Sequence, residues 1–241
     1  MKNDIVLVTG GARGIGAEIC ARLRSTGYRP VVLDILEPVG PGSNDFYPVD
    51  FADAKATRSV LEKVTAKYRI TNLVNNVGIV RPASLEDTAI EDFSDVLNVN
   101  ARSALMCLQA LLPAMRDQHF GRVVNITSRV ILGKELRTSY CASKGALAAM
   151  TKTWALELAA DGITVNAVAP GPIATEAFER NNPPEAPRTQ AIVNSVPVKR
   201  LGTPKDVAQA VSFFLDECNG FITGQTLFVC GGITIGLAPG G

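Results

Sequence analysis

IVLVTGGARGIG, residues 5–16, joins two patterns that together decide the fold. The aliphatic run IVLV predicts a strand buried on both faces, and the segment 15–27 has helical periodicity. Between them Gly10, Gly14 and Gly16 are spaced G-x-x-x-G-x-G. Glycine is required where a strand turns sharply into a helix and where a pyrophosphate approaches the backbone closely. The loop therefore predicts a phosphate site at a helix N-terminus, and the alternative is a tight turn that merely needs glycine.

The same alternation of apolar runs and helical patterns continues along the chain. Further strands are predicted at 30–34, 46–50, 72–78, 121–128, 163–171 and 226–232, and the longest helices at 92–115 and 139–162. This alternation predicts an α/β fold, a three-layer αβα arrangement around a doubly wound parallel sheet. A length of 241 residues suits a single domain, 1–241.

Two of the segments that connect predicted strands lack a clear helical pattern. A Pro- and Gly-rich run at 38–42 predicts a loop between the strands at 30–34 and 46–50. The segment 175–197 contains Pro183, Pro184 and Pro187 within a weak helical pattern and predicts a long, variable loop. Long loops inside compact domains are more often functional than idle, so we expect this segment to face the substrate.

Composition excludes several classes of function. The net charge is +1 without blocks of like charge, so no nucleic-acid partner is expected. The five cysteines form no CxxC pair, which argues against a disulfide framework or a metal site and favours a cytoplasmic location. No signal peptide is recognisable, and no apolar run reaches the ~20 residues of a membrane span.

An acidic residue follows the glycine loop at the end of the next predicted strand. Asp34 lies 18 residues after Gly16. A carboxylate there accepts hydrogen bonds from the adenosine ribose and repels a 2′-phosphate, which favours NAD over NADP. Arg13, inside the loop, could instead bind a 2′-phosphate and favour NADP. The structural alternative for Asp34 is that it only initiates a turn.

The stretch SYCASKGAL, 139–147, places Tyr140 four residues before Lys144. The two side chains would share one face of a helix, one turn apart. A free tyrosine titrates near pH ~10, and a nearby ammonium should lower that pKa by favouring the phenolate. We therefore predict Tyr140 as a general acid/base tuned by Lys144, with the hydroxyl of Ser128 polarising the substrate oxygen. The alternative is an ordinary surface pair.

These motifs, in this order, resemble the short-chain dehydrogenase/reductase family over about residues 3–232. The segment 9–16 resembles the family's TGxxxGIG, NNVG at 75–78 its NNAG, Tyr140 to Lys144 its YxxxK, and PGPIAT at 170–175 the segment that closes over the nicotinamide. Ser128 lies 12 residues before Tyr140, as the family's serine does. The resemblance implies a Rossmann fold and an NAD(P)-dependent oxidoreductase that interconverts a secondary alcohol and a ketone.

The resemblance also implies site residues. The implied catalytic set is Asn100, Ser128, Tyr140 and Lys144, in which Asn100 would anchor a water that leads to solvent. The implied cofactor set is Gly10, Arg13, Gly14, Ile15, Gly16, Asp34, Asp50, Phe51, Asn76, Gly78, Tyr140, Lys144, Ile173 and Thr175. In it Asp50 and Phe51 flank the adenine, and no metal is implied. Cys230 departs from the aspartate that the family commonly has in its final DGG.

The sequence motifs define the substrate and the oligomeric state less closely than the cofactor site. Val80, Val130, Leu132 and Leu136 predict an apolar pocket, whereas Arg129 and Arg137 are expected at the solvated surface, although either could pair with a substrate carboxylate. Oxidation of a cyclic dihydrodiol and a non-catalytic NAD(H) sensor stay open as alternatives; the ordered motifs disfavour a methyltransferase. We expect a small-molecule substrate, no nucleic-acid or membrane partner, and a homotetramer or homodimer built through the helices 92–115 and 139–160.

Overall fold

The computed structural model describes residues 4–38 and 45–235. At its centre is a seven-stranded parallel sheet in the order β3-β2-β1-β4-β5-β6-β7. The strands are β1 (Ile5–Thr9), β2 (Arg29–Asp34), β3 (Phe46–Pro48), β4 (Asn72–Asn75), β5 (Gly121–Ile126), β6 (Ile163–Pro170) and β7 (Thr226–Val229). The predicted doubly wound α/β sheet is confirmed, because the chain starts at the centre and winds outward in both directions.

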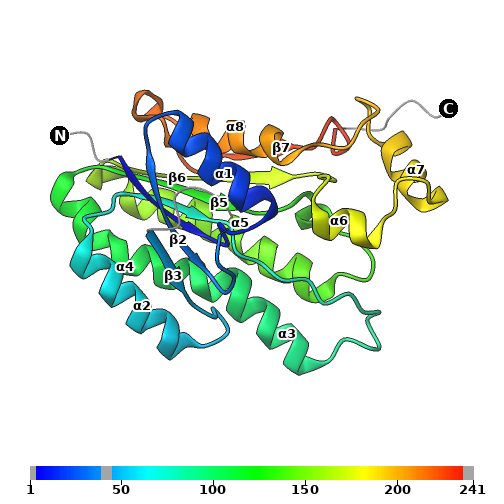
Figure 1. The fold of residues 1–241 in the computed structure, drawn as a ribbon, viewed down its shortest axis with the longest axis horizontal. Coiled ribbons are helices and arrows are strands. Elements are labelled where there is room, and N and C mark those ends of the chain that lie inside the picture. The colour runs from blue at the N-terminus through cyan, green and yellow to red at the C-terminus, as the bar shows by residue number, and fades with distance from the viewer. Residues whose placement is uncertain (1–3, 39–44, 236–241) are drawn as a thin grey trace.

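Helices cover both faces of this sheet (Figure 1). On one face α1 (Gly14–Ser25) packs against α8 (Pro204–Leu215). The other face carries α2 (Ala54–Lys67), α3 (Ile90–Leu97), α4 (Ser103–Gln118) and α5 (Thr138–Leu158). Two shorter helices, α6 (Glu176–Asn181) and α7 (Pro187–Ser195), lie between β6 and α8 in the chain.

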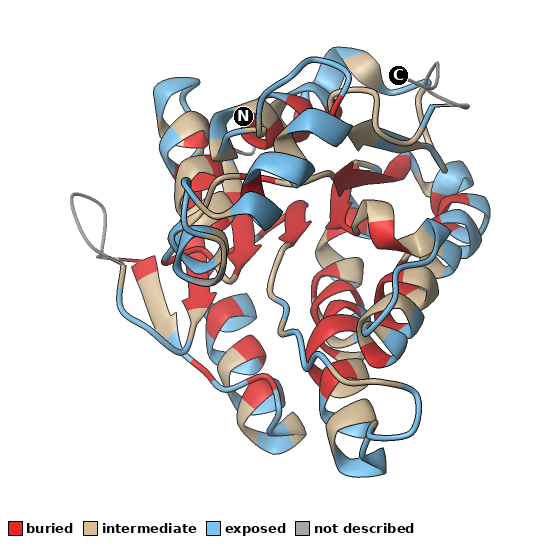
Figure 2. Ribbon diagram, turned by 90° about the vertical axis from the view of Figure 1, so that its right-hand side faces the viewer, coloured by how far each residue is buried: buried red, intermediate tan, exposed pale blue. Residues whose placement is uncertain are grey.

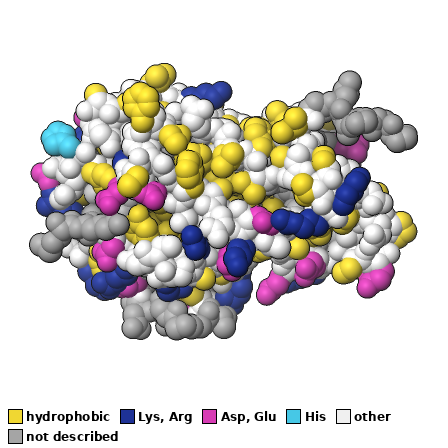
Figure 3. All heavy atoms as spheres, turned by 90° about the horizontal axis from the view of Figure 1, so that it is seen from above, with side chains coloured by type: hydrophobic (Ala, Val, Ile, Leu, Met, Phe, Trp, Pro, Cys, Tyr) yellow, Lys and Arg dark blue, Asp and Glu magenta, His cyan; other side chains and the backbone are white. Residues whose placement is uncertain are grey.

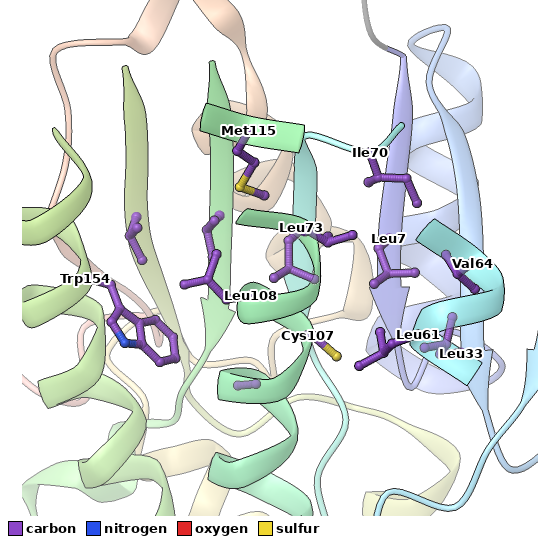
Figure 4. Close-up of a cluster of buried hydrophobic side chains, with 14 of the residues drawn as sticks. Leu7, Leu33, Leu61, Val64, Ile70, Leu73, Cys107, Leu108, Met115 and Trp154 are labelled. Carbon is purple, nitrogen blue, oxygen red and sulfur yellow. The ribbon is translucent and has the colours of Figure 1, made fainter. Parts of the chain in front are cut away.

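The hydrophobic core is divided in two by the sheet, because successive strand residues point to opposite faces. Leu7 packs with α2, α4 and α5, whereas Val6 and Val8 pack with α1 and α8. Figure 2 shows that buried residues concentrate on the strands and on the helix sides that face them. Figure 4 shows the first cluster, in which strand residues meet helix residues, among them Leu7, Leu33, Leu61, Val64, Leu73, Leu108, Met115 and Trp154.

The predicted helix at 92–115 is interrupted. A π-helical turn, η2 (Asn98–Arg102), separates α3 from α4 and contains Asn100. Such turns insert one extra residue into a helix and occur frequently at functional sites. The predicted helix at 139–162 is α5, followed by the 3₁₀ turn η4 (Ala159–Asp161), and Gly162 ends it with a φ of 74°.

The prediction of a long loop at 175–197 is wrong, because the segment contains α6 and α7. The Thr175 side chain caps α6 by accepting a hydrogen bond from the Phe178 N–H. Pro187 occupies the first turn of α7, where a missing N–H breaks no hydrogen bond. The prolines thus delimit two helices. Of the predicted loop between β2 and β3, residues 35–38 are not helical, and residues 39–44 lie outside the described residues.

The surface carries both signs of charge. On the face in Figure 3, basic and acidic side chains are interspersed, and hydrophobic side chains gather along its middle. In the part of the chain that the structure describes, no helix is long and apolar enough to cross a membrane.

Truncation of Leu7 tests the core. Leu7 is fully buried, so Leu7→Ala should lower the free energy of unfolding by about 2–5 kcal/mol. Denaturant unfolding followed by the fluorescence of Trp154, the one tryptophan, which lies in the same cluster, measures this loss. Leu156→Ala is the control, because Leu156 is 85% exposed and should change stability little. Equal effects of the two substitutions would contradict the assignment of the core.

Candidate active site

The glycine loop joins β1 to α1 in a backbone path that side chains would obstruct. Gly10 and Gly14 have φ of 64° and 53°, in the left-handed region. A Cβ on Gly16 would lie 1.9 Å from the carbonyl oxygen of Gly10. Helix α1 begins without a side-chain cap, so its first N–H groups are available to an anion.

The loop is held from β4 by Asn76. Its amide Nδ2 donates to the carbonyl oxygens of Thr9 at 3.1 Å and Gly10 at 2.8 Å. In return Thr9 Oγ1 accepts from the backbone N–H groups of Asn76 and Val77 at 3.0 and 3.1 Å. Asn76 therefore positions the loop as well as lining the groove beside it. Thr9 was missed as a site residue, although a threonine at the end of a buried strand next to glycine is a visible signal.

The loop is held from β2 by Asp34. Its Oδ2 accepts from the Ala12 N–H at 2.9 Å and its Oδ1 from the Leu36 N–H at 3.0 Å. The Arg13 guanidinium donates to the carbonyl oxygens of Ala12 and Glu37 at 2.9 and 3.1 Å. Asp34 therefore stabilises the turn that follows β2, which is the structural alternative considered from the sequence. It also places a carboxylate in the groove wall.

A groove of about 480 Å³ runs along this loop. Of the predicted cofactor residues, its wall contains Gly10, Arg13, Gly14, Ile15, Gly16, Asp34, Asn76, Gly78 and Thr175. A glycine cradle, a free helix N-terminus and an acid at the end of β2 fit a dinucleotide. The structure does not bring Asp50 and Phe51 to this wall: Phe51 is buried in the core, and Asp50 accepts a hydrogen bond from the Ala52 N–H.

A second pocket, of about 420 Å³, adjoins the groove and shares part of its wall with it. Ser128, Tyr140, Lys144 and Ile173 line this pocket. Ser128 follows β5 and caps the 3₁₀ turn η3 (Arg129–Leu132), accepting from the Val130 N–H. Tyr140 and Lys144 lie on α5, so the sheet edge and one helix bring the three predicted groups together.

Lys144 is almost completely buried, with 3% of its surface exposed. Its Nζ donates to the carbonyl oxygen of Ile126 at 2.7 Å and lies 5.8 Å from the centre of the Tyr140 ring. Burial lowers the pKa of Lys144 to about 8. Desolvation disfavours the charged form, and this contact with a carbonyl oxygen is too weak to restore it.

The expectation that the pKa of Tyr140 lies below that of a free tyrosine is wrong for this structure. Burial raises the pKa of Tyr140, although a hydrogen bond with Ser128 and the charge of Arg137 oppose the rise. Desolvation therefore outweighs the favourable charges, and the phenol is protonated at neutral pH.

Asn100 lines neither the groove nor the pocket. Its Oδ1 accepts from the Ile79 N–H at 2.8 Å, and its Nδ2 donates to the Ile79 carbonyl oxygen at 3.0 Å and to Ser143 Oγ at 3.0 Å. The amide therefore fixes the chain that follows β4 against α5. Ser143, missed in the sequence, completes this link by donating to the Tyr140 carbonyl oxygen. The role of Asn100 in a water relay stays a prediction.

The pocket wall differs from the apolar one predicted. Val80 and Val130 line it, but Leu132 and Leu136 do not and are 63% and 51% exposed. Arg129 and Arg137, expected at the solvated surface, are instead part of the wall, as is Lys134. The sequence does not predict that these three side chains share one wall, because residues 129–137 have neither helical nor strand periodicity.

Cys230, the departure from the family pattern, is buried after β7. Burial raises the pKa of its thiol, but hydrogen bonds from Thr234 and from the N–H groups of residues 232 and 233 outweigh this and lower it. Its Sγ lies 3.2 Å from Thr234 Oγ1. The thiol thus accepts local hydrogen bonds outside both the groove and the pocket.

Comparisons with known proteins agree with this geometry. A family model described as enoyl-(acyl carrier protein) reductase matches residues 10–234. The chain is 38% identical over 247 residues to 3-oxoacyl-(acyl-carrier-protein) reductase FabG of Thermotoga maritima, covering 98% of this chain and 99% of that one. It is 35% identical over 243 residues to acetoacetyl-CoA reductase of Rhizobium meliloti, covering 95% and 97%. The structure of ElxO with bound NADP superposes with a TM-score of 0.88 at 31% identity, covering 96% and 98%.

Substitution of Gly16 tests the phosphate cradle. Gly16→Ala puts a methyl group against the Gly10 carbonyl, so it should displace the loop and weaken NADH binding by at least about 10-fold. Titration of NADH fluorescence measures the affinity. Gly145→Ala is the matched control, because a Cβ there meets nothing within 4 Å. Unchanged affinity in Gly16→Ala would refute the cradle.

The pKa of Lys144 predicts a pH dependence of stability. The unfolded chain holds this proton up to about pH 10.5, and the folded protein only to about pH 8. Between these values the unfolded state binds more protons, so the contribution of Lys144 to the free energy of unfolding rises with pH. Denaturant unfolding from pH 7 to 10 should therefore give a more positive slope for the wild type than for Lys144→Met. Identical slopes would show that Lys144 titrates normally.

Proposed function

The chain belongs to the short-chain dehydrogenase/reductase family of oxidoreductases acting on CH–OH groups, and we propose that it interconverts a secondary alcohol and a ketone with Tyr140 as acid/base. The observation that carries the proposal is that the hydroxyl-bearing side chains of Tyr140 and Ser128 line one pocket, which adjoins the glycine-loop groove. A substrate oxygen placed at these two hydroxyls would lie beside the cofactor groove, within reach of both proton donors.

Each residue has a distinct part in this proposal. Ser128 holds the substrate oxygen and polarises the carbonyl. Tyr140 is protonated at neutral pH because burial raises its pKa, so it can donate a proton to the developing alkoxide. In the direction of oxidation Tyr140 accepts that proton, and protonated Lys144, 5.8 Å from its ring, favours the phenolate formed.

The nicotinamide cofactor, when bound, supplies or accepts the hydride. The glycine loop and the N-terminus of α1 would hold its pyrophosphate. We propose NAD as the preferred form, because the Asp34 carboxylate lies in the groove wall and repels a 2′-phosphate. Arg13 in the same wall and the NADP bound to ElxO favour NADP, so the preference requires a direct measurement.

The domain organisation, the location and the assembly of the protein are also proposals. We propose that residues 1–241 form one cofactor-binding domain in which 175–197 varies with the substrate. The cytoplasmic location and the homotetramer or homodimer also stay predictions.

A substrate panel with NADH and NADPH tests the proposal. Removal of the phenol in Tyr140→Phe should lower turnover about 10²- to 10⁴-fold, the usual contribution of a general acid/base, without weakening NADH binding. Tyr47→Phe, on β3 and outside the pocket, is the matched control. Retention of full turnover in Tyr140→Phe would refute the mechanism. Higher kcat/KM with NADPH than with NADH would refute the NAD preference alone.

A further inference from the structure

The pocket contains a group of cations that the proposed reaction does not use. Arg129, Lys134 and Arg137 line it together with Ser128 and Tyr140. All five residues belong to the single segment 128–140. A fourth cation, Arg188 on α7, is exposed, and its charge acts on Lys134.

No acidic residue compensates this charge. The residues that line the pocket include no Asp or Glu, and Glu135, on the same segment, is not among them. Within residues 4–38 and 45–235 we find no ion pair between any of these four cations and a carboxylate. Among the described residues, the hydrogen bond that Arg137 donates goes to the carbonyl oxygen of Leu136, at 2.8 Å.

The cations repel one another. The pKa of Lys134 is lowered, first by burial of its ammonium and then by the charges of Arg129, Arg137 and Arg188. A cluster of like charges in a pocket is unfavourable until an anion binds among them. The pocket is therefore electrostatically complementary to an anion.

We propose that Lys134 and Arg137, with Arg129, bind a carboxylate that the substrate carries close to its reacting carbon. This inference rests on the proposed oxidoreductase function. A guanidinium can bind a carboxylate through two parallel hydrogen bonds, and an ammonium adds a point charge. The preferred substrates are thus short keto acids and hydroxy acids.

The position of the cations favours an anion close to the reacting carbon. They line the same pocket of about 420 Å³ as Ser128 and Tyr140, so the bound charge and the reacting oxygen share one small cavity. In a coenzyme A or acyl-carrier-protein thioester, the pantetheine arm separates the phosphate from the carbonyl. That phosphate would lie outside the pocket while the carbonyl contacts Tyr140.

Binding of matched ligand pairs tests the inference. Calorimetry with oxidised cofactor present compares 2-oxobutanoate, acetoacetate and levulinate with their methyl esters, because ketones do not react in that complex. At least one keto acid should bind about 10- to 100-fold more tightly than its ester, as expected for hydrogen bonds to a charged group. Lys134→Gln and Arg137→Gln should abolish this preference without changing ester binding, and Arg137→Lys should restore part of it. Lys152→Gln, an exposed residue on α5, is the control and should keep the preference.

Turnover separates failure of the inference from failure of the proposed function. In the expected case Lys134→Gln raises KM for the keto acid and leaves kcat nearly unchanged. Arg137→Gln also raises KM, but it changes kcat as well, because the charge of Arg137 acts on Tyr140. Methyl esters that bind as tightly as the keto acids would overturn the inference. A higher kcat/KM for acetoacetyl-CoA than for the keto acids, unchanged in both variants, would also overturn it. In both cases the proposed function would survive if Tyr140→Phe abolished turnover of the ester or thioester.

Discussion

The backbone of Gly16 approaches the carbonyl group of Gly10 so closely that no side chain fits between them. This contact fixes the start of α1 against the end of β1. Three adjacent strands then hold the loop through one side chain each: Thr9 of β1, Asp34 of β2 and Asn76 after β4. Because these strands are parallel and in register, their carboxyl ends meet at one edge of the sheet. The groove therefore takes its shape from the sheet.

Burial, more than the attraction between charges, sets the protonation of the central pair. It raises the pKa of Tyr140 and lowers that of Lys144, so both neutral forms are favoured relative to exposed side chains. The pair lies in a region of low effective dielectric, where a charge is weakly screened. A charged group brought into the pocket therefore shifts both equilibria more than it would at the surface. The motif spacing predicts that Tyr140 and Lys144 lie close together. It does not predict whether burial or the attraction between charges sets their pKa values.

Most of the fold could be predicted from the sequence, because alternating apolar runs and glycine punctuation are local signals. The strand at 5–9 and the positions of Ser128, Tyr140 and Lys144 are examples. The π-helical turn at Asn98–Arg102 could not be predicted, because its helical periodicity continues on both sides. The position of Phe51 beside the adenine was implied by the resemblance alone, whereas in the structure its side chain is buried in the core. Lys134 was missed because its position depends on the path of an aperiodic turn.

The segment that contains α6 and α7 contributes to the pocket but to neither core cluster. Thr175, Ala177, Phe178 and Ile192 line the pocket, yet in the described chain no residue from 174 to 206 belongs to either cluster. Sequence change there is consequently uncoupled from the packing that stabilises the sheet. The residues that contact a substrate and the residues that pack the sheet are therefore largely different residues, so a substitution at Ala177, Phe178 or Ile192 should change the pocket without changing the core clusters.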